Sequence, residues 1–110
     1  MDGMDQMRMA ARRRARQLLL SCLTVEQRAC YLAHGYFDVR SCGRTYRIFQ
    51  GAHGNVALLD AQGRRVETYC AQPAGVPEED SMLAQKLSLE LAPAEFFRIA
   101  NVNRYPEPRA

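Results

Sequence analysis

The feature that most constrains this chain is the stretch of residues 36–71, in which four short apolar-rich runs are separated by three breaks that contain glycine. The breaks, at residues 41–44, 51–55 and 60–64, each have the length of a hairpin connection. Glycine supplies the positive φ that such tight turns need. The stretch therefore predicts a four-stranded antiparallel β-meander.

Alternation of side chains along the four runs assigns the two faces of the predicted sheet. We expect the core face to carry Phe37, Val39, Tyr46, Ile48, Val56, Leu58, Val66, Thr68 and Cys70. The opposite face would carry a mixture of aromatic and charged side chains, namely Tyr36, Arg40, Thr45, Arg47, Phe49, Leu59, Glu67 and Tyr69. A slip of one residue would exchange the two faces. The mixed face is either covered by helices or open to a partner.

Helical patterns flank the predicted meander on both sides. Residues 5–22 predict a basic amphipathic helix, whose apolar stripe is made of Met4, Met7, Ala11, Ala15, Leu18 and Cys22. Thr24 and Gln27 have the spacing of a capping box for a second helix, residues 25–34, and Gly35 is placed to end it. A third helix begins near Pro77, and residues 94–100 favour a fourth. The pattern indicates an α+β fold with the two C-terminal helices packed on the sheet.

The length of 110 residues suits one domain. Within it we expect the basic helix over residues 5–22, a compact α+β core over residues 24–101 and a mobile tail over residues 102–110, which holds two prolines. No run approaches the roughly 20 apolar residues of a membrane span, and no secretory signal precedes the cysteines. We therefore expect a soluble, cytoplasmic protein with reduced thiols and no membrane partner.

A cluster of arginines marks the first predicted helix. Residues 11–16 contain Arg12, Arg13, Arg14 and Arg16, four of the fourteen arginines of the chain. Three interpretations stay open: the solvated face of a helix in an arginine-rich proteome, contact with nucleic-acid phosphates, and docking to an acidic protein. The net charge of +3 is compatible with each of them.

Cysteine and histidine residues are scattered along the chain. Cys30 and His34 are four residues apart, but no paired ligand spacing accompanies them. Cys42, His53 and Asp60 lie in different predicted turns, and no motif brings a nucleophile and a base together. We therefore predict no catalytic residue, no metal site and no cofactor.

Two segments carry a resemblance to known proteins. Residues 82–87, Met-Leu-Ala-Gln-Lys-Leu, and residues 97–101, Phe-Arg-Ile-Ala-Asn, stand with a Tyr-Arg-Ile run in a predicted strand. They resemble a set of small bacterial proteins, of a kind borne by phages or mobile elements, that have no established activity. The resemblance covers residues 24–101 and implies a single α+β domain, to which the N-terminal helix is an addition. It supplies no functional residues.

These patterns predict a small non-enzymatic adaptor or regulatory protein. We expect it to bind a macromolecular partner, most simply another protein, through the basic helix and the mixed sheet face. The residues are Arg12, Arg13, Arg14, Arg16, Arg40, Arg47, Phe49 and Tyr69. The alternative is a nucleic-acid-binding protein that contacts phosphates through the four helix arginines. The apolar stripe of the same helix also suits the pairing of two copies of the chain.

Overall fold

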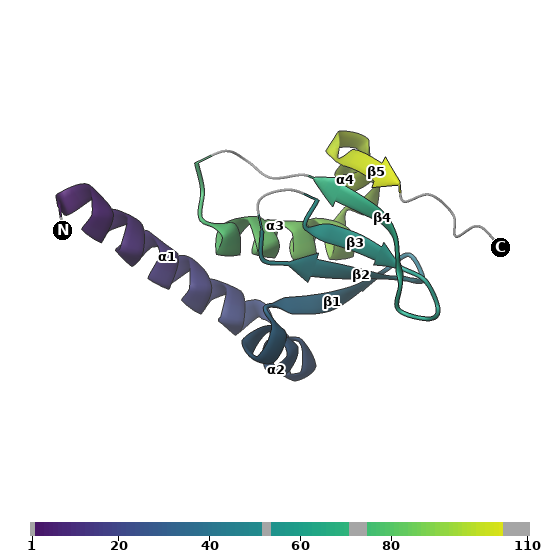
Figure 1. Cartoon of the computed structure of the whole chain (residues 1–110), viewed down its shortest axis with the longest axis horizontal. Coiled ribbons are helices and arrows are strands. Elements are labelled where there is room, and N and C mark those ends of the chain that lie inside the picture. The colour runs from purple at the N-terminus through teal and green to yellow at the C-terminus, as the bar shows by residue number, and fades with distance from the viewer. Residues whose placement is uncertain (1, 52–53, 71–74, 105–110) are drawn as a thin grey trace.

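A computed structural model describes residues 2–51, 54–70 and 75–104 (Figure 1). Its elements in chain order are α1 (Gly3–Cys22), α2 (Val25–His34), β1 (Tyr36–Ser41), β2 (Arg44–Phe49), β3 (Val56–Leu59), β4 (Arg65–Cys70), α3 (Glu78–Leu91), α4 (Pro93–Ile99) and β5 (Asn101–Arg104). The predicted α+β layout, with an antiparallel meander between two pairs of helices, is confirmed. His53 and residues 105–110 of the predicted tail lie outside the described residues.

The sheet has five strands in the order β1-β2-β3-β4-β5, one more than the sequence predicts. Residues 102–104, expected to belong to a mobile tail, instead lie in β5. This strand pairs antiparallel with β4, from Cys70↔Asn101 to Glu67↔Arg104. The pairing satisfies backbone groups that β4 would otherwise present as an open edge.

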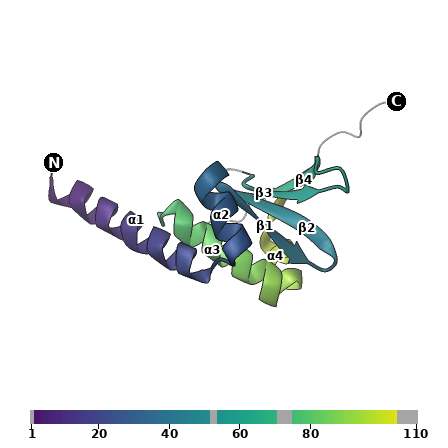
Figure 2. The ribbon, with the colours of Figure 1, turned by 90° about the horizontal axis from the view of Figure 1, so that it is seen from below.

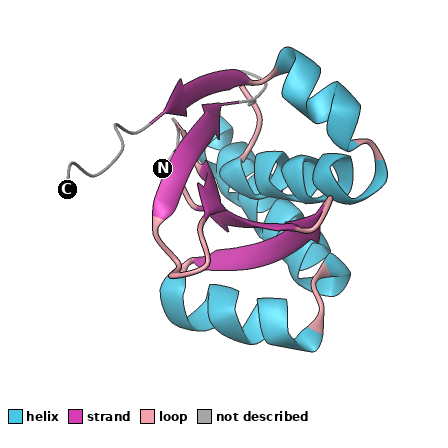
Figure 3. Ribbon diagram, turned by 90° about the vertical axis from the view of Figure 1, so that its right-hand side faces the viewer, coloured by secondary structure: helices cyan, strands magenta, loops and turns pink. Residues whose placement is uncertain are grey.

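Helices α3 and α4 lie across one face of the sheet, and α2 lies beside β1 (Figures 1 and 3). The core is formed by apolar side chains from both layers, among them Leu19, Phe37, Val39, Tyr46, Ile48, Val56, Met82, Leu89 and Phe96. α1 packs against α3, and its first half continues past the start of α3 (Figure 2). The fold thus has a compact body and one helix that reaches out of it.

Local signals set the helix ends as predicted. The capping box at Thr24 and Gln27 is present, and Gly35 ends α2 in the left-handed conformation with φ of 78°. α1 begins at Gly3, slightly earlier than predicted, because the Asp2 side chain accepts a hydrogen bond from the backbone N–H of Asp5 at 2.9 Å. These caps satisfy amides that would otherwise lack a partner at a helix start.

Buried polar side chains fix α3 on the sheet. The Asn55 side-chain amide donates to Gln85 Oε1 at 2.7 Å, and the Gln85 amide donates back to Asn55 Oδ1 at 3.0 Å. Ser41 Oγ donates to the carbonyl oxygen of Leu89 at 2.6 Å. Paired polar groups of this kind specify one register between helix and sheet.

The face of β4 is opposite to the predicted one. Tyr69 pairs with Val56 and is buried on the core side, where its ring centroid lies 5.3 Å from that of Phe97. Val66, predicted to face the core, is exposed. The β3–β4 pairing contains a register shift, which interrupts strict alternation along the strand. The assignment of Tyr69 to the outer, partner-binding face is therefore wrong.

The packed side of α1 also differs from the predicted stripe. Ala15 and Leu19 are its buried residues, whereas Leu18 and Cys22 are exposed. The buried side is rotated about the helix axis by roughly 60° from the middle of the predicted stripe. Most of the predicted stripe consequently faces solvent.

Candidate functional site

The first half of α1 projects from the body of the molecule (Figures 1 and 2). The longest dimension of the chain is 54 Å, and the other two are 28 and 27 Å. α1 meets the first turn of α3 at an ion pair, in which Arg12 Nε lies 3.5 Å from Glu79 Oε2. Residues 3–11, which precede this contact, span about 14 Å of helix. We call residues 3–14 the α1 arm.

A stripe of apolar side chains runs along the exposed side of α1. It consists of Met4, Met7, Ala11 and Leu18, and we call it the exposed stripe. Met4, Met7 and Leu18 are 65%, 71% and 52% exposed. With about 100° between successive residues, the four side chains fall within an arc of about 60°. The sequence predicts this stripe, but the structure places it on solvent rather than on the core.

The arginines of α1 divide into two groups. Arg12 pairs with Glu79, and the Arg16 guanidinium lies 5.6 Å from the ring centroid of Tyr31. Arg13 and Arg14 are exposed and make no ion pair or ring contact within the part of the chain that the structure describes. Two of the four predicted binding arginines are thus held by the domain and two are available.

Arg8 belongs to the available group, although the sequence reasoning did not select it. It is exposed and has no ion pair among the described residues. Arg8 lies outside the dense run of arginines at residues 12–16. Its position next to Met4 on a helical projection is the signal that could have identified it.

Glu79 is a buried carboxylate at the base of the arm. Its side chain is 5% exposed, against 64% for Arg12. Glu79 Oε1 has no hydrogen-bond partner among the described residues. Burying an ionised carboxylate that lacks hydrogen-bond partners costs free energy. The ion pair with Arg12 and the positive N-terminal end of α3 offset part of this cost. Arg12 consequently has a structural role in seating the arm.

The outer face of the sheet, opposite α3 and α4, carries a tightly paired arginine. Arg47 Nε donates to Asp38 Oδ1 at 2.8 Å, and Arg47 Nη2 donates to Asp38 Oδ2 at 3.1 Å. This bond raises the pKa of Arg47 above its ordinary value. The same guanidinium lies 4.2 Å from the ring centroid of Tyr36. Arg47 is therefore engaged inside the molecule rather than presented to a partner.

The aromatic rings of the outer face also have internal contacts. His34 stacks on Tyr36 with ring centroids 5.4 Å apart, and Tyr36 lies 5.3 Å from Phe49. The Arg65 guanidinium covers the Phe49 ring at 4.3 Å. A platform for nucleic-acid bases needs free ring faces. The structure therefore gives less support to base stacking than the composition of this face suggests.

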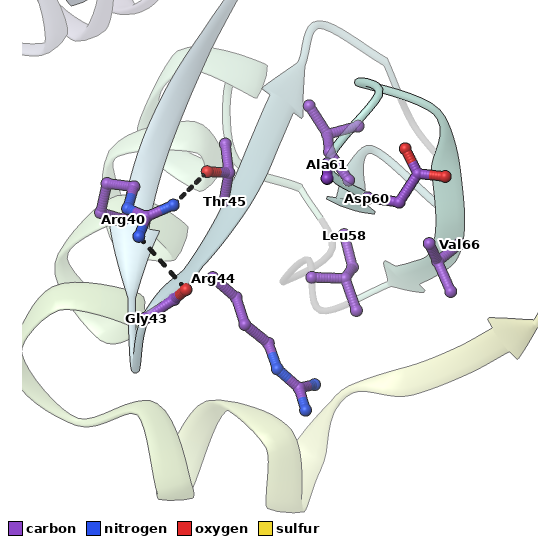
Figure 4. Close-up of a pocket in the computed structure, with 9 residues that line it drawn as sticks. Arg40, Gly43, Arg44, Thr45, Leu58, Asp60, Ala61 and Val66 are labelled. Carbon is purple, nitrogen blue, oxygen red and sulfur yellow. Dashed lines mark hydrogen bonds between the residues drawn. The ribbon is translucent and has the colours of Figure 1, made fainter.

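A depression of about 500 Å³ lies beside the β1–β2 and β3–β4 turns, and Figure 4 shows its lining. Arg40 donates to Thr45 Oγ1 at 2.7 Å and to the carbonyl of Gly43 at 3.2 Å. Asp60 accepts a hydrogen bond from the backbone N–H of Arg64 at 2.8 Å, which lowers the pKa of Asp60. Arg40 and Asp60 thus already have partners within their own hairpins, which makes the depression a weaker candidate for a charged ligand than its lining alone suggests.

A smaller hollow of about 280 Å³ lies on the helix side of the sheet, and Tyr46, Tyr69 and Phe97 line part of it. The Tyr69 hydroxyl donates a hydrogen bond to Glu67. Burial, reinforced by this bond, raises the pKa of Tyr69, and burial also raises the pKa of Tyr46. Tyr69 therefore belongs to an internal aromatic cluster with Tyr46 and Phe97.

The cysteine and histidine side chains that the structure describes do not gather at one place. Cys22 and Cys42 are exposed, whereas Cys30 and Cys70 are partly buried. Cys42 sits in the β1–β2 turn with φ of 53°. Within residues 2–51, 54–70 and 75–104, no group of three or more histidine, cysteine, aspartate or glutamate side chains is placed to hold a metal ion.

The fold and these surfaces define a small α+β protein with a projecting basic helix. The chain matches no protein-family model, and comparisons with curated proteins and with solved structures gave no significant match. Among the helices that the structure describes, none combines the length and the apolar character needed to cross a bilayer.

Proposed function

We propose that this chain is a small non-enzymatic adaptor or regulatory protein that binds another protein through the α1 arm. The observation that carries the proposal is the exposure of Met4 and Met7, at 65% and 71%, on a helix that projects from the body. Large apolar side chains gain free energy when a partner removes them from water. Methionine also adapts its shape to varied surfaces.

The sheet face has a smaller part in this proposal than the sequence suggests. Arg40 and Arg47 are bonded to neighbouring strand and turn residues, and Phe49 is covered by Arg65. A partner that used these groups would first have to break internal contacts. The arm needs no such rearrangement, since its exposed stripe and available arginines already face solvent.

Contact with nucleic acid is the second candidate function. It is favoured by the exposed arginines Arg8, Arg13 and Arg14 on a projecting helix. It draws less support than protein binding because Arg12 and Arg16, although exposed, already contact Glu79 and Tyr31 of the same chain. Phosphate contact also gives no role to the apolar side chains beside the arginines.

Affinity capture with matched variants tests the proposed function. The tagged full chain, the arm variant Met4→Ser/Met7→Ser and the body control Arg64→Ala/Arg98→Ala are each incubated with extract of cells that produce the chain. Arg64 and Arg98 are exposed arginines with local ion pairs away from the arm. We expect the same protein to be retained by the wild type and the control and lost from the arm variant.

Two results would contradict this function. Equal retention by the arm variant would show that the arm is not the binding surface. Retention that nuclease treatment abolishes would favour the nucleic-acid candidate, as would binding to duplex DNA whose affinity falls steeply with salt.

A further inference from the structure

We infer that α1 binds lengthwise in an apolar groove of an acidic protein. The exposed stripe faces the floor of the groove, and Arg8 and Arg14 pair with carboxylates on its two rims. This inference rests on the proposed function and specifies the chemistry of the partner.

The exposed stripe has the geometry of a helix that enters a groove. Met4, Met7, Ala11 and Leu18 recur at steps of three, four and seven residues, the spacing of anchors on one helix face. Ala11 lets a partner approach closely between the larger side chains. The stripe extends over about four turns, so a partner can engage the helix along most of its length.

The available arginines are arranged around this stripe in an uneven way. Arg8 lies about 40° beyond Met4 on one side, and Arg14 lies about 20° beyond Met7 on the other. Arg13 points about 150° away from the middle of the stripe. A groove that holds the stripe therefore has Arg8 and Arg14 at its rims and leaves Arg13 in solvent.

The charge of the arm distinguishes between possible binding partners of α1. The arm carries Arg8, Arg13 and Arg14 free of internal ion pairs among the described residues, against Asp2 and Asp5 near its start. Two arms packed side by side would bring arginines together, so a second copy of the chain is disfavoured. An acidic partner instead gains from both the apolar stripe and the flanking arginines.

Nucleic acid would use the same charges differently. A phosphate backbone attracts Arg13 as strongly as Arg8 and Arg14, because long-range electrostatic attraction does not depend on how close an arginine lies to the exposed stripe. A protein groove that holds the exposed stripe instead contacts Arg8 and Arg14 and leaves Arg13 in solvent. Comparing substitutions of Arg13 with substitutions of Arg8 and Arg14 therefore distinguishes groove binding from phosphate binding.

The test measures binding of the full chain to calcium-loaded calmodulin, an acidic protein with methionine-rich apolar grooves that accept basic amphipathic helices. Titration calorimetry compares the wild type with Met7→Ser, with Arg8→Gln/Arg14→Gln and with the matched control Arg13→Gln. We expect the dissociation constant to rise about tenfold for Met7→Ser and about fivefold for the double arginine variant. The control should change it by less than about twofold. All four positions are exposed, and circular dichroism verifies that each variant is folded.

Three results would overturn the inference. They are no binding to calmodulin, equal weakening by Arg13→Gln and by the double variant, or a dissociation constant insensitive to Met7→Ser. Duplex DNA and anionic phosphatidylglycerol vesicles serve as competing probes, and tighter binding to either one than to calmodulin would also overturn it. The proposed function is tested independently of calmodulin binding. It fails if the arm variant Met4→Ser/Met7→Ser still retains the protein captured from cell extract.

Discussion

Replacing Arg12 by alanine will lower the free energy of unfolding by about 1–2 kcal/mol. The magnitude follows from the unequal burial of the ion pair. Removing one member of a fully buried pair costs about 3–5 kcal/mol, whereas exposed pairs contribute less than about 1 kcal/mol. Glu79 is 5% exposed and Arg12 is 64% exposed, so the pair lies between these limits. The cost arises mainly from leaving the Glu79 carboxylate buried without its ion-pair partner.

A double-mutant cycle isolates this effect. Urea unfolding is followed by circular dichroism for the wild type, Arg12→Ala, Glu79→Gln and the double variant. Glu79→Gln removes the buried charge, so Arg12→Ala should cost less than about 0.5 kcal/mol in that background. The expected coupling free energy is about 1 kcal/mol. Arg13→Ala is the matched control, and its exposed side chain predicts a change within about 0.5 kcal/mol.

The reasoning would be refuted if Arg12→Ala had the same cost with and without the Glu79 charge. It would also be refuted if Arg12→Ala and Arg13→Ala were indistinguishable, because the arm would then be seated on α3 without this ion pair. Either result would return Arg12 to the set of arginines available for a partner.

Three further predictions concern the body of the protein. Cys42→Asn should raise the free energy of unfolding by about 0.5–1 kcal/mol, because asparagine tolerates the left-handed conformation seen at φ of 53° better than cysteine does. Urea unfolding measures this change, and an unchanged free energy of unfolding would argue against strain in this turn. Asn55→Ala should lower the free energy of unfolding by about 2 kcal/mol in the same assay, since it removes two buried hydrogen bonds between Asn55 and Gln85. A decrease below about 0.5 kcal/mol would contradict this role. The raised pKa of Tyr69 means that its neutral form stabilises the fold below pH of about 10 and that this contribution is lost as pH rises further. Tyr69→Phe should flatten that alkaline decline in the free energy of unfolding, and an unchanged decline would contradict it.

The helices and the meander could be predicted because their signals are local. The capping box at Thr24 and Gln27, the glycine after α2 and the glycine-bearing hairpin breaks each act over a few residues. Core residues such as Phe37 and Ile48 followed from clean alternation in β1 and β2. In these segments propensity, pattern and turn chemistry agree.

β4 could not be assigned by the same reasoning. Val66 and Thr68 stand on one side of the strand, and Glu67 and Tyr69 on the other, so each side mixes apolar and polar groups. The register shift against β3 adds an irregularity that alternation does not anticipate. β5 was missed for a different reason, since it follows from backbone pairing with β4 and not from side-chain periodicity.

The candidate site was only partly visible in the sequence. The basic character of α1 was predicted, and Arg13 and Arg14 are exposed in the structure. Which side of α1 packs depends on where α3 lies, and both sides of the helix offer apolar residues. The internal partners of Arg12 and Arg47 come from distant elements or a neighbouring strand, so single-sequence patterns do not reveal them.

Hydrogen–deuterium exchange of the full chain, free and in complex with the protein captured from cell extract, tests the central claim most directly. If the arm is the binding surface, amides of residues 3–14 gain protection in the complex, while those of β2 and β3 keep the exchange rates of the free chain. The opposite pattern, with protection gained on β2 and β3 and unchanged exchange in the arm, would contradict the account and assign binding to the sheet.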